Sequence, residues 1–159
     1  MNQIIKLLEE NARYSNEEIA VMLNTTADDV RAQIDKLEKE GIIRGYKVII
    51  DREKVSENHV EALIELKVTP KRDFGFDEIA DKIAQYPEVE DLYLMSGGFD
   101  LALILSGKTF KDIALFVSQR LATLDSVVST ATHFVLSRYK EKGVIINNTS
   151  LDERGNASL

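Results

Sequence analysis

The stretch that most constrains this 159-residue chain runs from residue 15 to residue 51, SNEEIAVMLNTTADDVRAQIDKLEKEGIIRGYKVIID. It holds two short amphipathic patterns of helical period, separated by the polar corner NTT. Ser15 and Glu18 have capping-box spacing, and Thr26 is an N-cap for the second helix. Gly41 ends that helix, because glycine adopts left-handed backbone angles at little cost. With the short basic strand that follows, this predicts a winged or wing-like helix-turn-helix; a plain helical hairpin is the alternative.

Composition limits the classes of protein that fit. The chain has no cysteine, which excludes disulfides and thiolate metal sites. Its first residues carry charges too early for a signal peptide, and apolar runs such as 101–105 are too short to span a bilayer. We therefore expect a cytoplasmic protein with no membrane contact. The net charge of −7 argues against a nonspecific nucleic-acid coat, so DNA binding would need a local basic face or a dimer.

The second half of the chain has a different hydrophobic periodicity. Strand patterns alternate with two amphipathic helices in the order βαββαβ, which is ferredoxin-like. The expected strands are 60–68, 89–95, 99–105 and 127–139, and the expected helices are 76–86 and 109–124. The predicted class is thus α+β: a helix-turn-helix domain at 1–51, a linker at 52–58, a βαββαβ effector-binding and oligomerisation domain at 59–146, and a disordered tail at 147–159.

Such a sheet has helices on one side, so we expect its other face to be apolar and to form a dimer interface. Five residues are expected to supply the two sides of the sheet: Ala62, Ile64, Leu66, Leu101 and Leu103.

Three motifs carry a resemblance to a known family. They are IIKLLEENARYS at 4–15, LEKEGIIRGYKVIID at 37–51 and SGGFDLAL at 96–103. In this order and spacing they resemble the Lrp/AsnC family of transcription regulators over residues 3–146. The resemblance implies double-stranded DNA as a partner, amino-acid sensing by the second domain, and a homo-oligomer that is a dimer or an octamer of four dimers.

Candidate DNA contacts follow from the second helix of the corner and the strand after it. Arg31 is the strongest, being basic and one turn into the helix. Asp28 and Asp29 suit the positive end of the helix dipole but repel phosphates, and they depart from the family's usual residues. The predicted DNA-binding set is Thr26, Arg31, Lys36, Arg44 and Lys47. Lys36 has the alternative of a solvated pair with Glu40.

Candidate effector contacts lie in the SGGFD turn. Its amides, near Gly97 and Gly98, can hold a carboxylate, and Asp100 can hold an ammonium group. We expect both glycines to need positive φ, and Asp100 to have little packing role. The predicted effector-binding set is Ser96, Gly97, Gly98, Asp100 and Thr132. A plain hairpin turn, with Thr132 as an ordinary strand residue, is the alternative.

Enzyme chemistry has little support. His59 and His133 lie in different predicted strands without a partner at metal-ligand spacing, and no phosphate loop or nucleophile elbow is present. We expect no catalytic residue, metal or cofactor. Two alternatives to a ligand-responsive regulator stay open. One is a metabolite-sensing subunit that binds DNA weakly and assembles with related regulators; the other is a haem-precursor decarboxylase, which some similar proteins are.

Overall fold

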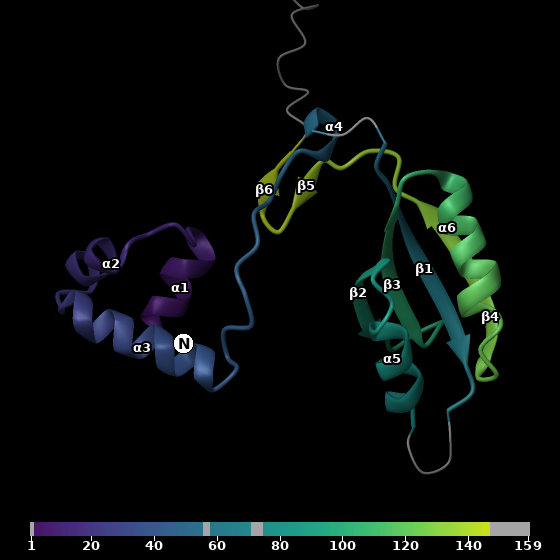
Figure 1. Ribbon diagram of the computed structural model, residues 1–159, viewed down its shortest axis with the longest axis horizontal. Coiled ribbons are helices and arrows are strands. Elements are labelled where there is room, and N and C mark those ends of the chain that lie inside the picture. The colour runs from purple at the N-terminus through teal and green to yellow at the C-terminus, as the bar shows by residue number, and fades with distance from the viewer. Residues whose placement is uncertain (1, 56–57, 71–74, 147–159) are drawn as a thin grey trace, which may run out of the picture. The chain divides into compact units, whose positions relative to one another are not determined.

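The computed structural model describes residues 2–55, 58–70 and 75–146 (Figure 1). Contacts divide the chain into two units, Met1–Val48 and Ile49–Leu159, which are described separately below. The division falls three residues before the expected end of the first domain. The predicted tail at 147–159 lies outside the described residues.

The first unit is a three-helix domain built from α1 (Gln3–Glu10), α2 (Asn16–Leu23) and α3 (Ala27–Lys39). Local side chains start each helix. Ser15 and Glu18 form the predicted capping box on α2, and the Thr26 side chain accepts a hydrogen bond from the amide of Asp29 on α3. One residue set forms the core of this unit: Ile4, Ile19, Ala20 and Val30.

The end of α3 also follows local chemistry, but the strand expected after it does not form. Gly41 has φ +69° and ends the helix as predicted. Residues 44–50 have no regular secondary structure and are exposed. A strand needs a neighbour that accepts and donates its backbone hydrogen bonds, and the described residues of this single chain provide none here.

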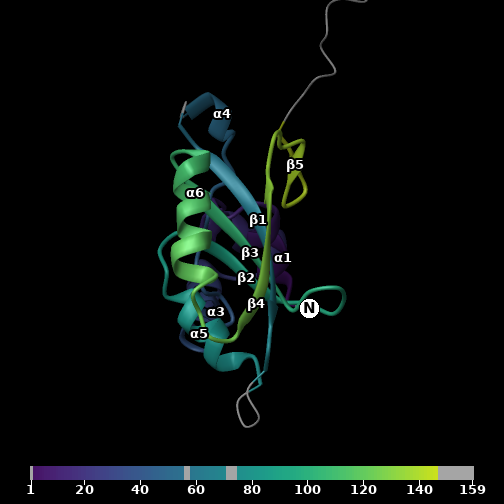
Figure 2. The same cartoon turned by 90° about the vertical axis from the view of Figure 1, so that its right-hand side faces the viewer.

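The second unit has the predicted βαββαβ order. The elements are β1 (Val60–Val68), α5 (Asp77–Ala84), β2 (Val89–Leu94), β3 (Leu101–Gly107), α6 (Phe110–Phe116) and β4 (Val127–Phe134). The strands form one antiparallel sheet in the order β2-β3-β1-β4. Helices α5 and α6 lie on the same face of that sheet (Figure 2). The ferredoxin-like class is therefore confirmed.

One face of the sheet makes the core of this unit. Its fully buried strand residues include Ala62, Ile64, Leu66, Leu101 and Leu103. We expected these five residues to serve both sides of the sheet, and that was wrong. They occupy every second position of paired strands, and alternation sends all of them to the helix-covered face. The other face carries Leu63, Ala102 and Ile104 instead.

Several boundaries differ from the sequence prediction. The last strand ends at Phe134 rather than 139, and a hairpin of β5 (Lys140–Glu141) and β6 (Val144–Ile145) follows. Lys142 and Gly143 both have positive φ at its turn, which suits a two-residue hairpin. The helix expected at 109–124 is α6 followed by a π-helical turn, η1 (Val117–Leu121). The linker contains a short helix, α4 (Arg52–Val55).

Candidate nucleic-acid interface and effector site

The start of α3 is held by its own side chains. The Thr26 hydroxyl donates a hydrogen bond to Asp29 Oδ2 at 2.7 Å, and Thr25 donates to the same oxygen at 3.3 Å. Hydrogen bonds from Thr26 and then Thr25 lower the pKa of Asp29. Asp29 thus acts in the helix cap. Thr26, expected as a DNA contact, is occupied in the same cap, so its contribution is to fix where α3 begins.

The basic side chains of this unit differ in whether they already make contacts within the chain. Arg31 and Lys47 are exposed. Lys36 Nζ lies 3.8 Å from Glu40 Oε1 with both side chains well solvated, which is the alternative considered from the sequence. Arg44 folds back over the end of α3, where a Cβ on Gly41 would lie 3.0 Å from its Cζ. Arg31 and Lys47 are therefore the cations most ready to meet a phosphate or base.

Tyr46 connects the irregular segment to α3. Its hydroxyl donates to Glu38 Oε1 at 2.9 Å, although half of the tyrosine is exposed. Burial, followed by the hydrogen bond and charge of Glu38, raises the pKa of Tyr46. The contact ties the irregular segment that carries Lys47 to the end of α3.

The SGGFD turn connects β2 to β3 and is open to solvent. The amide of Met95 donates to the Asp100 carbonyl at 2.8 Å and closes the turn. Ser96, Gly97 and Gly98 are exposed, and among the described residues no backbone carbonyl accepts from their amides. Gly98 does not have the positive φ that we expected, and a Cβ there would meet no atom within 4 Å. The turn's amides are thus available without Gly98 being strained.

Asp100 has a structural role that the sequence did not reveal. Its Oδ2 accepts a hydrogen bond from the amide of Val68 at 2.8 Å, and its own amide donates to the Leu66 carbonyl at 2.9 Å. The pairing of β1 with β3 ends at Leu66 and Leu101, so the Val68 amide, which points to the β3 side, has no strand partner there and takes a side-chain acceptor. The expectation that Asp100 has little packing role was wrong.

Thr132 does not join the turn within one chain. It pairs with Ile64 on β1, whereas the turn meets β1 at Leu66. Thr132 shares the helix-covered face with Ile64, its partner on β1. Leu101 lies on that face too, so its neighbour Asp100 lies on the other face of the sheet. The described chain therefore gathers Ser96, Gly97, Gly98 and Asp100 and leaves Thr132 apart.

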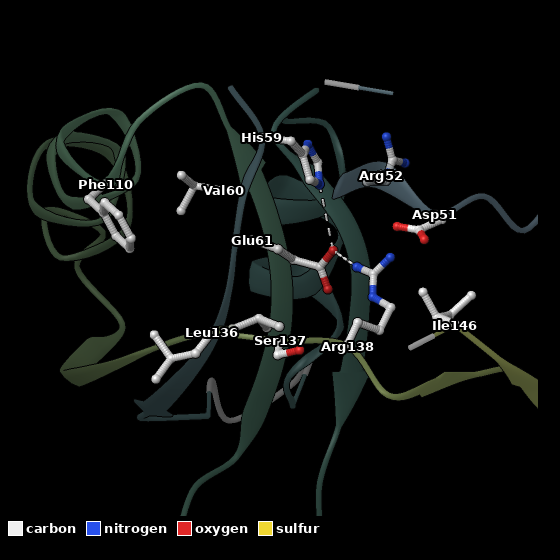
Figure 3. A pocket seen from close by; sticks show the side chains of 11 residues that line it. Asp51, Arg52, His59, Val60, Glu61, Phe110, Leu136, Ser137, Arg138 and Ile146 are labelled. Carbon is white, nitrogen blue, oxygen red and sulfur yellow. Dashed lines mark hydrogen bonds and ion pairs between the residues drawn. The ribbon is translucent and has the colours of Figure 1, made fainter. Parts of the chain in front are cut away.

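A second cluster, missed from the sequence, lies at the other end of β1. Arg138 forms an ion pair with Glu61 (Figure 3). It forms a second one, at 2.7 Å, with Glu141. Burial lowers the pKa of the guanidinium, but hydrogen bonds and charge attraction from these two carboxylates outweigh burial and raise it. His59 Nε2 lies 3.8 Å from Glu61 Oε2, beyond hydrogen-bond distance, and has no partner within the described part of the chain.

This cluster borders a cavity of about 430 Å³. Its lining comes from the linker, the start of β1, the start of α6 and the segment after β4: Asp51, Arg52, His59, Val60, Glu61, Phe110, Val135, Leu136, Ser137, Arg138 and Ile146. Among the residues that the structure covers, no helix is long and apolar enough to cross a membrane, and no three His, Asp or Glu side chains are grouped to hold a metal ion.

Known proteins match both units. A family model of a winged helix-turn-helix DNA-binding domain matches residues 2–44, and one of the Lrp/AsnC ligand binding domain matches residues 61–145. The uncharacterized HTH-type transcriptional regulator YugG of Bacillus subtilis is 47% identical over 153 residues, which is 96% of this chain and 92% of YugG. The transcriptional regulator LrpA of Pyrococcus abyssi is 29% identical, covering 86% and 94% of the two chains.

Solved structures share the fold. The crystal structure of PH0061 superposes with a TM-score of 0.76 at 25% identity, covering 91% of this chain and 98% of that one. The L-Met complex of the transcriptional regulator NMB0573 from Neisseria meningitidis gives 0.70 at 23% identity, covering 89% and 93%. The relatives are regulators, which agrees with a non-enzymatic role and leaves the decarboxylase alternative without support.

Proposed function

The chain belongs to the Lrp/AsnC family of DNA-binding transcription regulators, and we propose that its binding to DNA responds to a free amino acid. The observation that carries this proposal is the pairing, in one chain, of a helix-turn-helix with a ligand-binding domain whose SGGFD turn has exposed, unpaired amides. The complex of a structural neighbour with L-Met supports an amino acid as the effector.

The effector would use the charges at the turn. Amides of Ser96, Gly97 and Gly98 point to a site for its carboxylate, since adjacent backbone N–H groups form anion-binding concavities. The Asp100 carboxylate would hold the ammonium group, because a carboxylate can accept further hydrogen bonds besides the one from Val68. Thr132 would contribute only from another subunit, given its place on the opposite face of the sheet.

On the DNA side, α3 would enter the major groove. Arg31 would reach a base edge or phosphate near the start of the helix, and Lys36, Arg44 and Lys47 would contact phosphates. Both Lys36 and Arg44 have intramolecular contacts to give up first, so Arg31 and Lys47 are expected to contribute most. Thr26 would act indirectly, by fixing the first turn of α3.

Homo-oligomers would form through the open face of the sheet. That face presents Leu63 and Ile104, both partly buried, beside the half-exposed Tyr93. No described helix of the second unit covers it (Figure 2). An uncovered sheet face with these side chains favours a second copy of the chain as its cover. Light scattering at micromolar concentration would oppose this if it gave a 17.9 kDa monomer.

The direct test is a gel shift on DNA upstream of the protein's own gene, with and without each of the twenty amino acids. We expect a specific shift whose midpoint moves with at least one amino acid. Mass photometry on the same samples would report whether that amino acid also changes the assembly. A specific shift that no amino acid alters would leave a regulator without the proposed effector.

A second candidate is a sensing subunit that binds DNA weakly and works within mixed assemblies. The exposed Asp28 at the start of α3 favours it, because this carboxylate repels phosphates and has no partner in the described region. An amino-acid response in mass photometry, combined with no gel shift at low salt, would favour this candidate over the first.

A further inference from the structure

The cavity beside His59 lies at the opposite end of β1 from the SGGFD turn. Val60 pairs with Gly107 at the cavity end, and Leu66 pairs with Leu101 at the turn end. Six residues of extended strand separate the two ends, roughly 20 Å at the usual rise per residue. A small molecule at the SGGFD turn therefore cannot also fill the cavity, and the two sites are distinct.

The polar side of the cavity is balanced in charge. Asp51 and Glu61 are acidic, and Arg52 and Arg138 are basic, so these four side chains sum to no net charge. Arg52, one of these four, and His59 are open to a ligand. Arg52 is only loosely paired, 3.8 Å from Glu90, and His59 Nε2 is buried without a hydrogen-bond partner within the described residues. A buried polar atom without a hydrogen-bond partner is unfavourable, so a ligand that supplies the partner binds more tightly.

The opposite side of the cavity is apolar. Val60, Phe110 and Leu136 lie there, away from the Glu61–Arg138 pair, and Ile146 lies beyond Arg138 (Figure 3). The phenyl ring of Phe110 is fixed by an edge-on contact with Phe134, with ring centroids 4.8 Å apart. A mostly apolar wall with a few convergent polar groups, at this volume, is typical of small-molecule sites.

We propose that this cavity binds a small zwitterion with an apolar side chain, such as an apolar α-amino acid, as a second ligand site separate from the SGGFD turn. A zwitterion adds no net charge to a balanced lining, whereas an anion or cation alone leaves one charge uncompensated. Its carboxylate meets Arg52 and His59, its ammonium group meets Glu61, and its side chain lies against Val60 and Phe110.

Binding here joins the linker to the sheet. Arg52 follows closely on the boundary between the two units at Val48 and Ile49, and Glu61 belongs to β1. A ligand that bridges Arg52 and Glu61 therefore stabilises the short helix α4 against the sheet. This gives the ligand a route to the segment that carries the DNA-binding unit, without any change at the SGGFD turn.

The absence of tryptophan from the chain allows a clean reporter. Phe110→Trp places a single indole in the cavity wall, and Leu115→Trp places one on the same helix but outside the lining. We expect leucine to change the emission of the first variant in a saturable way and to leave the second unchanged. The 2-oxo acid of leucine lacks the ammonium group and 3-methylbutylamine lacks the carboxylate, so each should bind at least about tenfold more weakly.

Matched charge variants test the site itself. Arg52→Gln should weaken leucine binding by at least about tenfold, because it removes a charge-assisted hydrogen bond. Lys82→Gln is at an exposed lysine of α5 outside the lining, so it should change binding by less than about twofold. Calorimetry on these two variants without the tryptophan gives the same comparison if Phe110→Trp fails to fold.

Asp100→Asn in the reporter chain separates this site from the proposed effector turn. A retained emission change supports a separate cavity site, even if the amino-acid response at the turn is lost. A change that disappears with Asp100→Asn, or that Arg52→Gln and Lys82→Gln alter equally, would overturn the assignment. No response of the reporter to leucine, methionine or phenylalanine would overturn it as well.

Discussion

Replacing Asp100 separates a structural role from a ligand role, because two substitutions remove different parts of the side chain. Asp100→Ala removes the acceptor of the Val68 amide, a partly buried hydrogen bond of 2.8 Å to a charged group. Such bonds contribute about 1.5–3 kcal/mol, and the amide left behind has no partner on β3, because the pairing of β1 with β3 ends at Leu66. Asp100→Asn keeps an acceptor oxygen in the same place, so it should cost only about 1 kcal/mol or less.

The free energy of unfolding is measured by urea titration followed by circular dichroism, and the ligand affinity by calorimetry. We expect Asp100→Ala to lower the melting temperature by several degrees, since about 1 kcal/mol shifts it by roughly 2–4 °C at this chain length. Asp100→Asn should stay near wild type in stability yet weaken the effector by at least about tenfold. Asp81→Ala, at an exposed carboxylate on α5, is the control. Equal stability of all three variants would refute the structural role of Asp100.

Three further outcomes are expected. Arg31→Ala should cost about 1–3 kcal/mol of the free energy of binding to the specific DNA site. Lys47→Ala should weaken binding to all DNA sequences alike and reduce the slope of log affinity against log salt concentration by about one. Gel shifts over a salt series measure both. Gly41→Ala should destabilise the first unit by about 1–2 kcal/mol in urea unfolding, because its φ of +69° is unfavourable for a residue with a Cβ. The raised pKa of Tyr46 stabilises the fold below pH 10.0 and this stabilisation is lost as pH rises through the raised pKa; Tyr46→Phe should remove that alkaline loss in pH-dependent melting.

The features predicted correctly from the sequence are those that depend on near neighbours. The Ser15–Glu18 capping box, the Thr26 cap and the Gly41 stop each involve residues within four positions of one another, so their spacing can be read directly. The βαββαβ order also follows from the change between helical and strand periods. The strand at 44–50 was overpredicted, because composition indicates β propensity but not whether a neighbouring strand exists.

The features that were missed depend on residues far apart in sequence. Asp100 and Val68 are separated by 32 positions, and Arg138 and Glu61 by 77. Glu61 has the position of a solvent-facing residue in an alternating strand, and His59 has no partner at metal-ligand spacing. Only the pairing of β1 with β4, which continues through a hydrogen bond from the amide of Val135 to the carbonyl of Glu61, brings the segment after β4 to them.

The strand β1 connects the two proposed ligand sites. It lies inside the sheet, paired with β3 on one side and β4 on the other. Asp100 binds its backbone at Val68, at one end, and Arg138 pairs with its Glu61 at the other. Its core-facing residues between these ends are fully buried, so the strand cannot shift along its axis without disturbing the packing beneath α5 and α6. Ligands at the two ends would therefore act on one rigid element, the turn ligand through Asp100 and its bond to Val68, and the cavity ligand through Glu61.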